Sequence, residues 1–338
     1  MARYAAQRLL LMIGILLGVL TITFILSRVL PGSPVELMLG HRPTPELIEA
    51  TKKELGLDQP LIIQYFTYIG EVVQGEFGKS LRTGRPVLEE VGKRIGATLE
   101  LTTLAIFFVV LIGVPLGVIS AVRQNSILDN GLRATTIAGM AFPAFMLAMM
   151  LQMLFYGELG WLPLQGRLDS EVLLDLTFPR HTGFFLLDTL MTGDWRAFGS
   201  AAQHIVLPAL TLVIITLATV TRITRNMMVE VLSEEFIRTA SAYGLPSRRI
   251  HYGYALKATL IPLLTVVGLT YGYLLGGAVV VEFVFDWPGL GGFMVFSISQ
   301  NDFPAVMGTT LFLATAYLMI NLVVDLLYFV VDPRLRAQ

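Results

Sequence analysis

Long apolar segments alternate with polar ones along this chain of 338 residues. A helix rises about 1.5 Å per residue, so roughly 20 apolar residues cross the hydrocarbon core of a bilayer. The predicted spans cover residues 9–30, 99–122, 132–156, 205–220, 260–281 and 306–331. The pattern therefore predicts an all-α, polytopic membrane protein with six transmembrane helices.

Two polar stretches are too long to be simple turns. Residues 31–97 contain three amphipathic patterns, which predict short helices at 44–56, from Pro60 onward, and from Pro86 to about residue 95. Residues 157–203 carry scattered Gly and Pro and predict a structured loop. The predicted regions are an N-terminal span (1–30), an external helical region (31–97) and a core of five spans (98–338) with a cytoplasmic loop at 223–257.

Composition supports membrane insertion and narrows the chemistry. The chain is 54% hydrophobic and 14% charged, whereas soluble domains carry roughly 25% charged residues. It has no cysteine, and its four histidines show no helical pairing, which argues against thiolate and zinc chemistry. The full phosphate-binding pattern Gly-x4-Gly-Lys-Ser/Thr is absent, so we expect no ATP hydrolysis by this chain. The sequence predicts no catalytic residue, no metal site and no nucleic-acid partner.

The distribution of Lys and Arg predicts the orientation, because short cytoplasmic loops are enriched in both. Placing both termini in the cytoplasm puts these residues inside: Arg3, Arg8, Arg123, Arg133, Arg222, Arg225, Arg238, Arg248, Arg249, Lys257, Arg334 and Arg336. The loop at 282–304 then faces outward and contains neither Lys nor Arg. This orientation places residues 223–257 in the cytoplasm.

Residues 234–243 form a short predicted helix with a signal at each end. Ser233 can accept hydrogen bonds from the first backbone N–H groups, and Glu234 and Glu235 suit the first turn. Gly244 fits a left-handed C′ position, and Pro246 prevents continuation. Such a helix between two spans predicts a docking element for a soluble partner, although an ordinary polar hairpin would show similar signals.

The same stretch resembles a known motif. It reads Phe236-Ile237-Arg238-Thr239-Ala240-Ser241-Ala242-Tyr243-Gly244-Leu245. This resembles the cytoplasmic coupling loop, or EAA loop, of ABC-importer permeases, and is most similar to the branch that serves oligopeptides, dipeptides and nickel. The generic Glu-Ala-Ala is replaced by Arg238-Thr239-Ala240. Segments 30–34, 55–60, 77–80, 287–291 and 301–304 resemble further motifs of that branch.

The resemblance implies a type I importer permease in a bacterial or archaeal cytoplasmic membrane. It implies a second related permease, two ATP-binding subunits and a periplasmic or lipid-anchored solute-binding protein as partners. ATP and Mg would be bound by partner subunits, with no cofactor on this chain. Peptides are the expected cargo, with nickel or another small solute as alternatives. The coupling residues implied are Glu234, Glu235, Phe236, Arg238, Thr239, Ala240, Ala242 and Gly244.

Two further motifs have a functional and a structural interpretation. Gly268, Gly272 and Gly276 lie on one face of the fifth span and predict a gate or permease–permease seam, or else tight packing within one subunit. The external segment Trp287-Pro288-Gly289 predicts an outer-gate loop, or else an aromatic anchor at the membrane edge.

Asp325, one turn after Asn321, is the one acid well inside a predicted span. An ionisable group at that depth is a functional candidate, and a proton-coupled secondary transporter would need one. The structural alternative is an ion pair or hydrogen bond near the inner surface with Arg222 or Arg225. A single acid does not make a proton relay, so the structural alternative is favoured.

Overall fold

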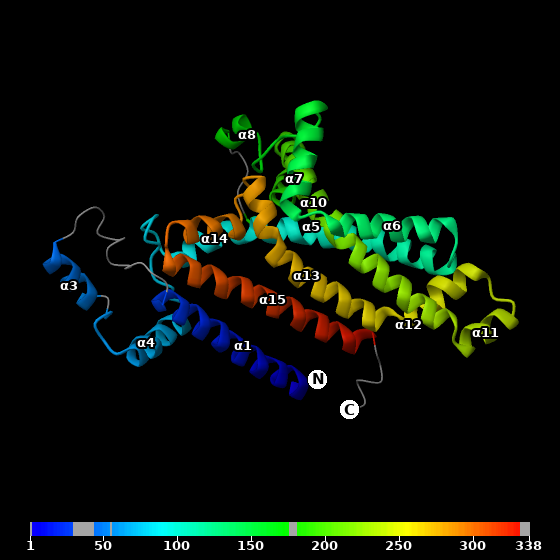
Figure 1. Ribbon diagram of the computed structural model, residues 1–338, viewed down its shortest axis with the longest axis horizontal. Coiled ribbons are helices and arrows are strands. Elements are labelled where there is room, and N and C mark those ends of the chain that lie inside the picture. The colour runs from blue at the N-terminus through cyan, green and yellow to red at the C-terminus, as the bar shows by residue number, and fades with distance from the viewer. Residues whose placement is uncertain (1, 30–43, 55, 176–180, 332–338) are drawn as a thin grey trace. The chain divides into compact units, whose positions relative to one another are not determined.

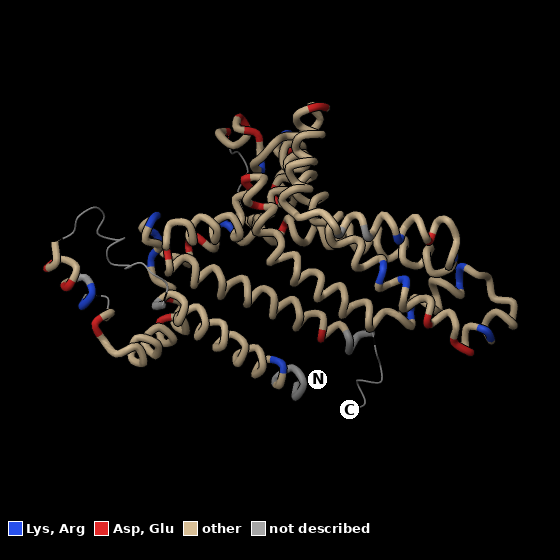
Figure 2. Tube along the Cα trace, in the orientation of Figure 1, with Lys and Arg blue, Asp and Glu red and all other residues tan. Residues whose placement is uncertain are grey.

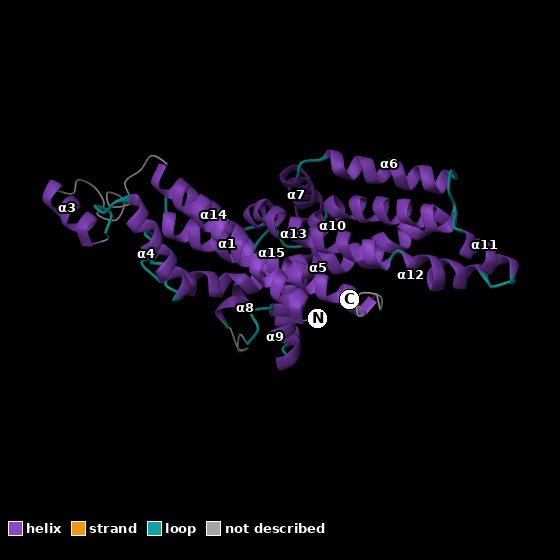
Figure 3. Cartoon of the chain, turned by 90° about the horizontal axis from the view of Figure 1, so that it is seen from below, coloured by secondary structure: helices purple, strands orange, loops and turns teal. Residues whose placement is uncertain are grey.

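The computed structural model describes residues 2–29, 44–54, 56–175 and 181–331. Over these residues the regular secondary structure is helical, as Figure 3 shows, and the only β-type contact is an isolated bridge between Lys79 and Pro86. The predicted all-α fold is confirmed. The motif at 30–34, Leu55, Arg334 and Arg336 lie outside the described residues. The chain divides into two compact units, and each is described by itself.

Unit 1 comprises Met1–Ala97 and Pro288–Leu318. Its elements are α1 (Ala2–Val29), α3 (Pro45–Glu54), α4 (Leu61–Val73), the start of α5 (Val87–Val122), α14 (Leu290–Ser299) and the first part of α15 (Phe303–Val331). Helix α1 contacts α4 (Figure 1). The Thr21 and Tyr65 hydroxyls are 2.6 Å apart, and the Phe24 ring stacks on Tyr68. Burial and the nearby Glu71 raise the pKa of Tyr68 to about 12.

Two sequence motifs of unit 1 meet at Asp302. Ser80 Oγ donates to Asp302 Oδ2 over 2.5 Å, and the Leu81 N–H donates to Oδ1 over 3.1 Å. The carboxylate is 1% exposed. These contacts join segments 77–80 and 301–304, which lie more than 200 residues apart. An apolar cluster supports them, formed by Val87, Val91, Leu290, Phe293 and Ala305.

Unit 2 comprises Thr98–Trp287 and Met319–Gln338. Besides the remainder of α5 and α15, it contains α6 (Ile127–Ala141), α7 (Ala144–Gln152), the π-helix η1 (Met153–Glu158), α8 (Ser170–Leu174), α9 (Phe185–Thr192), α10 (Trp195–Leu232), α11 (Glu235–Ala242), the π-helix η2 (Arg249–Ala255), α12 (Leu256–Ala258) and α13 (Leu260–Val284). Helix α10 is the central element and packs against α6, α7, α9 and α13 (Figure 1).

Helix α5 corrects the prediction that a separate helix ends near residue 95. A single helix runs over Val87–Val122. The acids in the first part of this helix are paired within the fold, because Glu90 binds Arg94 and Glu100 binds Arg167. Paired carboxylates can be buried in a continuous helix, and both acids are less than 5% exposed.

Three other predicted boundaries change. The third span is not continuous, because Phe142 is extended and Pro143 precedes a new helix. The fourth span begins earlier than predicted, at Trp195, where the Asp194 side chain accepts from the Ala197 N–H over 3.0 Å. A further helix, α14, occupies part of the predicted external loop 282–304. In the described part of the chain, the other five predicted spans appear as helices long and apolar enough to cross a membrane.

Candidate functional site

The predicted docking helix is present as α11, at the tip of a hairpin between α10 and α13 (Figure 1). Its predicted N-cap is wrong. Ser233 Oγ donates to the Glu230 carbonyl over 2.6 Å, so this hydroxyl caps the C-terminal end of α10. Glu234 takes the N-cap position, without a side-chain capping bond. The reason is local competition, since a hydroxyl can bond back to a helix carbonyl as easily as forward to an N–H group.

The predicted C-terminal signal of α11 is confirmed. Gly244 has φ +73°, the left-handed conformation that favours glycine. Its N–H donates to the Ser241 carbonyl over 3.0 Å, and the Leu245 N–H donates to the Ala240 carbonyl over 3.3 Å. This pair of bonds is a Schellman motif. The helix therefore ends at a fixed place, and the chain turns toward η2.

One face of α11 is anchored inside the hairpin. Ile237 and Ala240, one turn apart, are 5% and 7% exposed. They belong to an apolar cluster with Val118 and Ala121 of α5, Met228 of α10, and Ile250 and Ala255 of η2. Ala240 is therefore enclosed by its own chain, whereas Ala242 is exposed. A force applied to α11 would reach the ends of α5 and α10 through these contacts.

The opposite face of α11 is open to a partner. The exposed predicted coupling residues are Glu234, Glu235, Phe236, Arg238, Thr239, Ala242 and Gly244. Figure 2 shows acidic and basic positions together on this helix. Phe236 is 45% exposed, and Tyr243, seven residues later on the same face, is 83% exposed. The sequence analysis did not select Tyr243, although an aromatic at i+7 from an exposed Phe was a usable signal.

A buried ion pair fixes the base of the hairpin. Arg225 of α10 donates from Nε and Nη2 to the two carboxylate oxygens of Asp129, over 2.6 and 2.7 Å. Asp129 also accepts from Ser120 Oγ over 2.5 Å and from the Asn125 N–H over 3.0 Å. The fully buried carboxylate thus links α5, α6 and α10.

This arrangement corrects one predicted contact. Arg225 was a possible partner of the acid on α15, but Asp129 binds it instead. Asn321 and Asp325 both lie partly buried on α15.

The glycines of α13 differ from one another. A Cβ atom on Gly268 would lie 2.7 Å from Val324 Cγ2 of α15, so this glycine serves packing within the chain. Gly272 is partly buried. Gly276 is exposed, and among the described residues a Cβ atom added to it would meet nothing within 4 Å. A second close helix contact involves backbone, because a Cβ atom on Gly117 of α5 would lie 2.8 Å from the Thr221 carbonyl oxygen of α10.

The side chain of Trp287 is buried within unit 2 and is not exposed at the surface. Its side chain is 2% exposed. The Arg167 guanidinium lies 5.2 Å from its ring centroid and 3.7 Å from that of Phe185. Arg167 also pairs with Glu100, whose other oxygen accepts from the Leu186 N–H over 2.7 Å. Trp287 thus positions its segment, whereas the side chain of Pro288 is exposed and Gly289 is buried. The sequence analysis missed Arg167 and Glu100.

A groove of about 450 Å³ runs between α10 and α13. It is lined by Ile215, Thr216, Thr219, Ile223, Val266, Leu269, Thr270 and Tyr273. None of these side chains is charged, and four carry a hydroxyl group. The groove can therefore contact apolar groups and donate or accept hydrogen bonds without fixing a charge.

Comparison with known proteins identifies the family. Residues 113–337 match the family described as the binding-protein-dependent transport system inner membrane component. Residues 1–102 match the corresponding N-terminal family. The chain belongs to this family of transport permeases. The predicted resemblance is thereby confirmed.

The alignments of this permease with its relatives cover nearly the full length of both chains. It is 49% identical over 319 residues to a probable D,D-dipeptide transport system permease protein of Escherichia coli (strain K12), covering 94% of this chain and 93% of the relative. It is 40% identical to a dipeptide transport system permease protein of Alkalihalophilus pseudofirmus, covering 99% and 100%. A glutathione transport system permease protein of Salmonella choleraesuis is 37% identical, with both chains fully covered.

Membership makes the chain a membrane-embedded translocation component of an ABC importer. A transport system of this kind includes a solute-binding protein and other subunits.

Proposed function

We propose that this permease passes peptides inward across the cytoplasmic membrane. Relatives matched over 94% or more of this chain are named for dipeptides, D,D-dipeptides and glutathione. The groove between α10 and α13 offers hydroxyl groups and apolar surface without charge, which suits a peptide backbone flanked by varied side chains. The alternative cargo for an importer of the same class is a nickel complex or another small solute. The proton-coupled carrier is not proposed, because this family works with a binding protein.

The proposed assembly contains four other subunits. A second homologous permease completes the pathway, with Gly272 and Gly276 of α13 as seam or gate residues. Two ATP-binding subunits hold ATP and Mg and hydrolyse the nucleotide. A periplasmic or lipid-anchored solute-binding protein delivers the cargo from outside, near Pro288. Both termini and the α11 hairpin lie in the cytoplasm, in line with the Lys and Arg distribution.

The observation that carries the mechanism is the two-sided α11. Its exposed face presents Phe236, Arg238 and Tyr243, while Ile237 and Ala240 are buried against α5, α10 and η2. Closure of the ATP-binding subunits would push the exposed face, and the buried face would pass this movement to the helix ends. Because α10 is continuous over Trp195–Leu232, the same movement would reach the groove and alternate its access.

The chain has no cysteine, which permits a direct test. Ala242→Cys places a thiol on the exposed face of α11, and Thr83→Cys places one on the exposed loop of unit 1 as a matched control. With a short crosslinker in native membranes, we expect Ala242→Cys to capture a protein with an ATP-binding phosphate loop, identified by mass spectrometry. Thr83→Cys should not capture it. Failure at Ala242→Cys across several crosslinker lengths, in correctly inserted protein, would reject α11 as the coupling element.

A further inference from the structure

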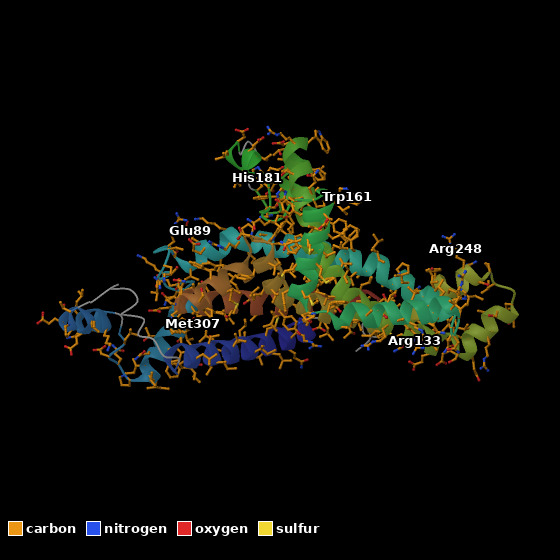
Figure 4. All side chains as sticks on the ribbon, turned by 45° about the horizontal axis from the view of Figure 1, so that its top comes forward. Glu89, Arg133, Trp161, His181, Arg248 and Met307 are labelled. Carbon is orange, nitrogen blue, oxygen red and sulfur yellow. The ribbon has the colours of Figure 1, made fainter. Side chains whose placement is uncertain are left out.

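A polar cavity of about 410 Å³ lies within unit 2, between α6, α10 and the turn that joins α5 to α6. It is separate from the groove between α10 and α13, because no lining residue is shared. Its cationic side chains are Arg133 of α6, which Figure 4 labels, and Arg222 and Arg225 of α10. No acidic side chain is among the described residues that line it.

The positive charge of this cavity is only partly compensated. Arg225 is neutralised by Asp129, which lies fully buried. Among the described residues, no hydrogen bond or ion pair engages the guanidinium groups of Arg133 and Arg222. Within the described part of the chain, two arginines therefore face one cavity without a counter-charge. Arg133 and Arg222 are both exposed, so water screens their mutual repulsion, and an anion bound between them would remove it. The arrangement therefore favours an anionic ligand.

The remaining lining groups fit oxygen atoms of that anion. Gln124 and Asn226 contribute side-chain amides, and Thr136 contributes a hydroxyl group. Guanidinium groups form planar paired hydrogen bonds that match phosphate geometry. The chemistry points to a phosphate group.

The surroundings select the source of the phosphate. The turn beside the cavity exposes Ile127 at 93%, Val122 at 39% and Leu128 at 37%. These residues lie within four positions of Gln124. In a membrane protein, such apolar exposure beside cations matches the boundary between headgroups and acyl chains, where basic pockets bind anionic lipid. A soluble phosphate compound would gain nothing from the apolar rim.

We propose that this cavity binds the phosphate of an anionic phospholipid through Arg133 and Arg222. The acyl chains would extend past Ile127 and Leu128. The lipid would sit against the helices that the Asp129–Arg225 pair holds together. The inference is independent of the cargo and of the ATP-binding partners.

The test uses the purified full chain in mild detergent and native mass spectrometry. Wild type should retain one phosphatidylglycerol per chain on titration and should prefer it over phosphatidylcholine. A basic residue near a membrane surface contributes about 1 kcal/mol to binding anionic lipid, so Arg133→Gln with Arg222→Gln should weaken phosphatidylglycerol binding about thirtyfold. The single variant Arg133→Lys, which keeps both positive charges, should bind phosphatidylglycerol nearly as well as wild type.

The matched control is Arg123→Gln, an exposed arginine on the same turn that does not line the cavity. It should bind phosphatidylglycerol as wild type does. Equal binding by the double variant, confirmed as folded by its thermal unfolding midpoint, would overturn the proposal. Equal binding of phosphatidylcholine would also overturn it. Displacement of the lipid by millimolar inorganic phosphate would reassign the site to a soluble phosphate ligand and reject the lipid.

Discussion

Unit 2 contains two buried arginine–carboxylate pairs that use the same chemistry in different surroundings. Arg167 and Glu100 are 7% and 4% exposed, and the rings of Phe185 and Trp287 cover the guanidinium. Arg225 and Asp129 instead border a polar cavity, and the arginine side chain is 13% exposed. The first pair is enclosed by aromatic groups, whereas water can reach the second.

The difference separates a static frame from a part that can move. An enclosed ion pair must stay together, because each unpaired charge would lose its solvation. A pair that borders an open polar cavity tolerates displacement, because water entering the cavity can replace part of the partner. The tolerant pair lies at the base of the α11 hairpin, where the proposed mechanism requires movement. Four substitutions test this contrast, in order of decreasing expected effect.

The largest effect is expected for Arg167→Met, which leaves Glu100 buried without a counter-charge. Breaking a buried pair from one side costs about 3–5 kcal/mol, measured as the free energy of unfolding in detergent. The control is Arg196→Met, because the side chains of Arg196 and its partner Glu171 are exposed at 65% and 84%, and such pairs contribute below about 1 kcal/mol. Similar losses in both variants would show that Arg167 is not enclosed.

A smaller loss is expected for Asp129→Asn. The amide keeps an acceptor for Ser120 but loses the paired charge for Arg225, at a cost of about 2 kcal/mol, because the arginine side chain is partly exposed to solvent. The measurement is the same unfolding free energy, with Asp175→Asn as the exposed control. A loss as large as that of Arg167→Met would mean that both pairs are equally enclosed.

Gly117→Ala sharpens the comparison at the crossing of α5 and α10. The new Cβ would lie 2.8 Å from the Thr221 carbonyl oxygen, and such overpacking costs about 1–2 kcal/mol. Gly276→Ala, in open space, should change stability by less than about 0.5 kcal/mol. If Gly276 lies at the permease–permease seam, the Gly276→Ala substitution should nevertheless lower peptide uptake. Unchanged uptake would remove Gly276 from the seam.

Of the four principal substitutions, Gly244→Ala should change stability least, since a left-handed alanine costs about 1 kcal/mol. Gly193 offers a matched control, because it has φ +72° and ends α9 with the same pair of hydrogen bonds. Both variants should lose similar stability, but only Gly244→Ala should reduce ATP-driven uptake. Equal uptake by the two variants would contradict a coupling role for the end of α11.

Local patterns predicted much of this molecule and could not predict the rest. Apolar length located five of the six predicted spans, and Gly244 located the end of α11, because both signals act within a short stretch of chain. The contacts that hold the α11 hairpin and the Ser80–Asp302 junction of unit 1 depend on residues far apart. Arg225 and Asp129 are separated by 96 positions, and Ser80 and Asp302 by 222. No periodicity reports such a pairing.

The errors have the same origin. The break predicted near residue 95 is absent, and the pairings of Glu90 with Arg94 and of Glu100 with Arg167 that lie on either side of it could not be assigned in advance. Ser233 could bond in two directions, and the sequence does not decide between them. Trp287 looked like a surface anchor because its cover, Arg167, comes from a segment 120 residues earlier.

Because α11 has a buried and an exposed face, different residues hold its fold and face the proposed partner. Ile237, Ala240 and Gly244 hold the helix in place. Positions such as Phe236, Arg238 and Tyr243 can then be rewritten without refolding the hairpin. If this face binds the ATP-binding subunits as proposed, duplicated permeases could come to bind different ATP-binding subunits by changing these exposed residues alone. The same substitutions would allow a permease to be engineered to bind another ATP-binding subunit.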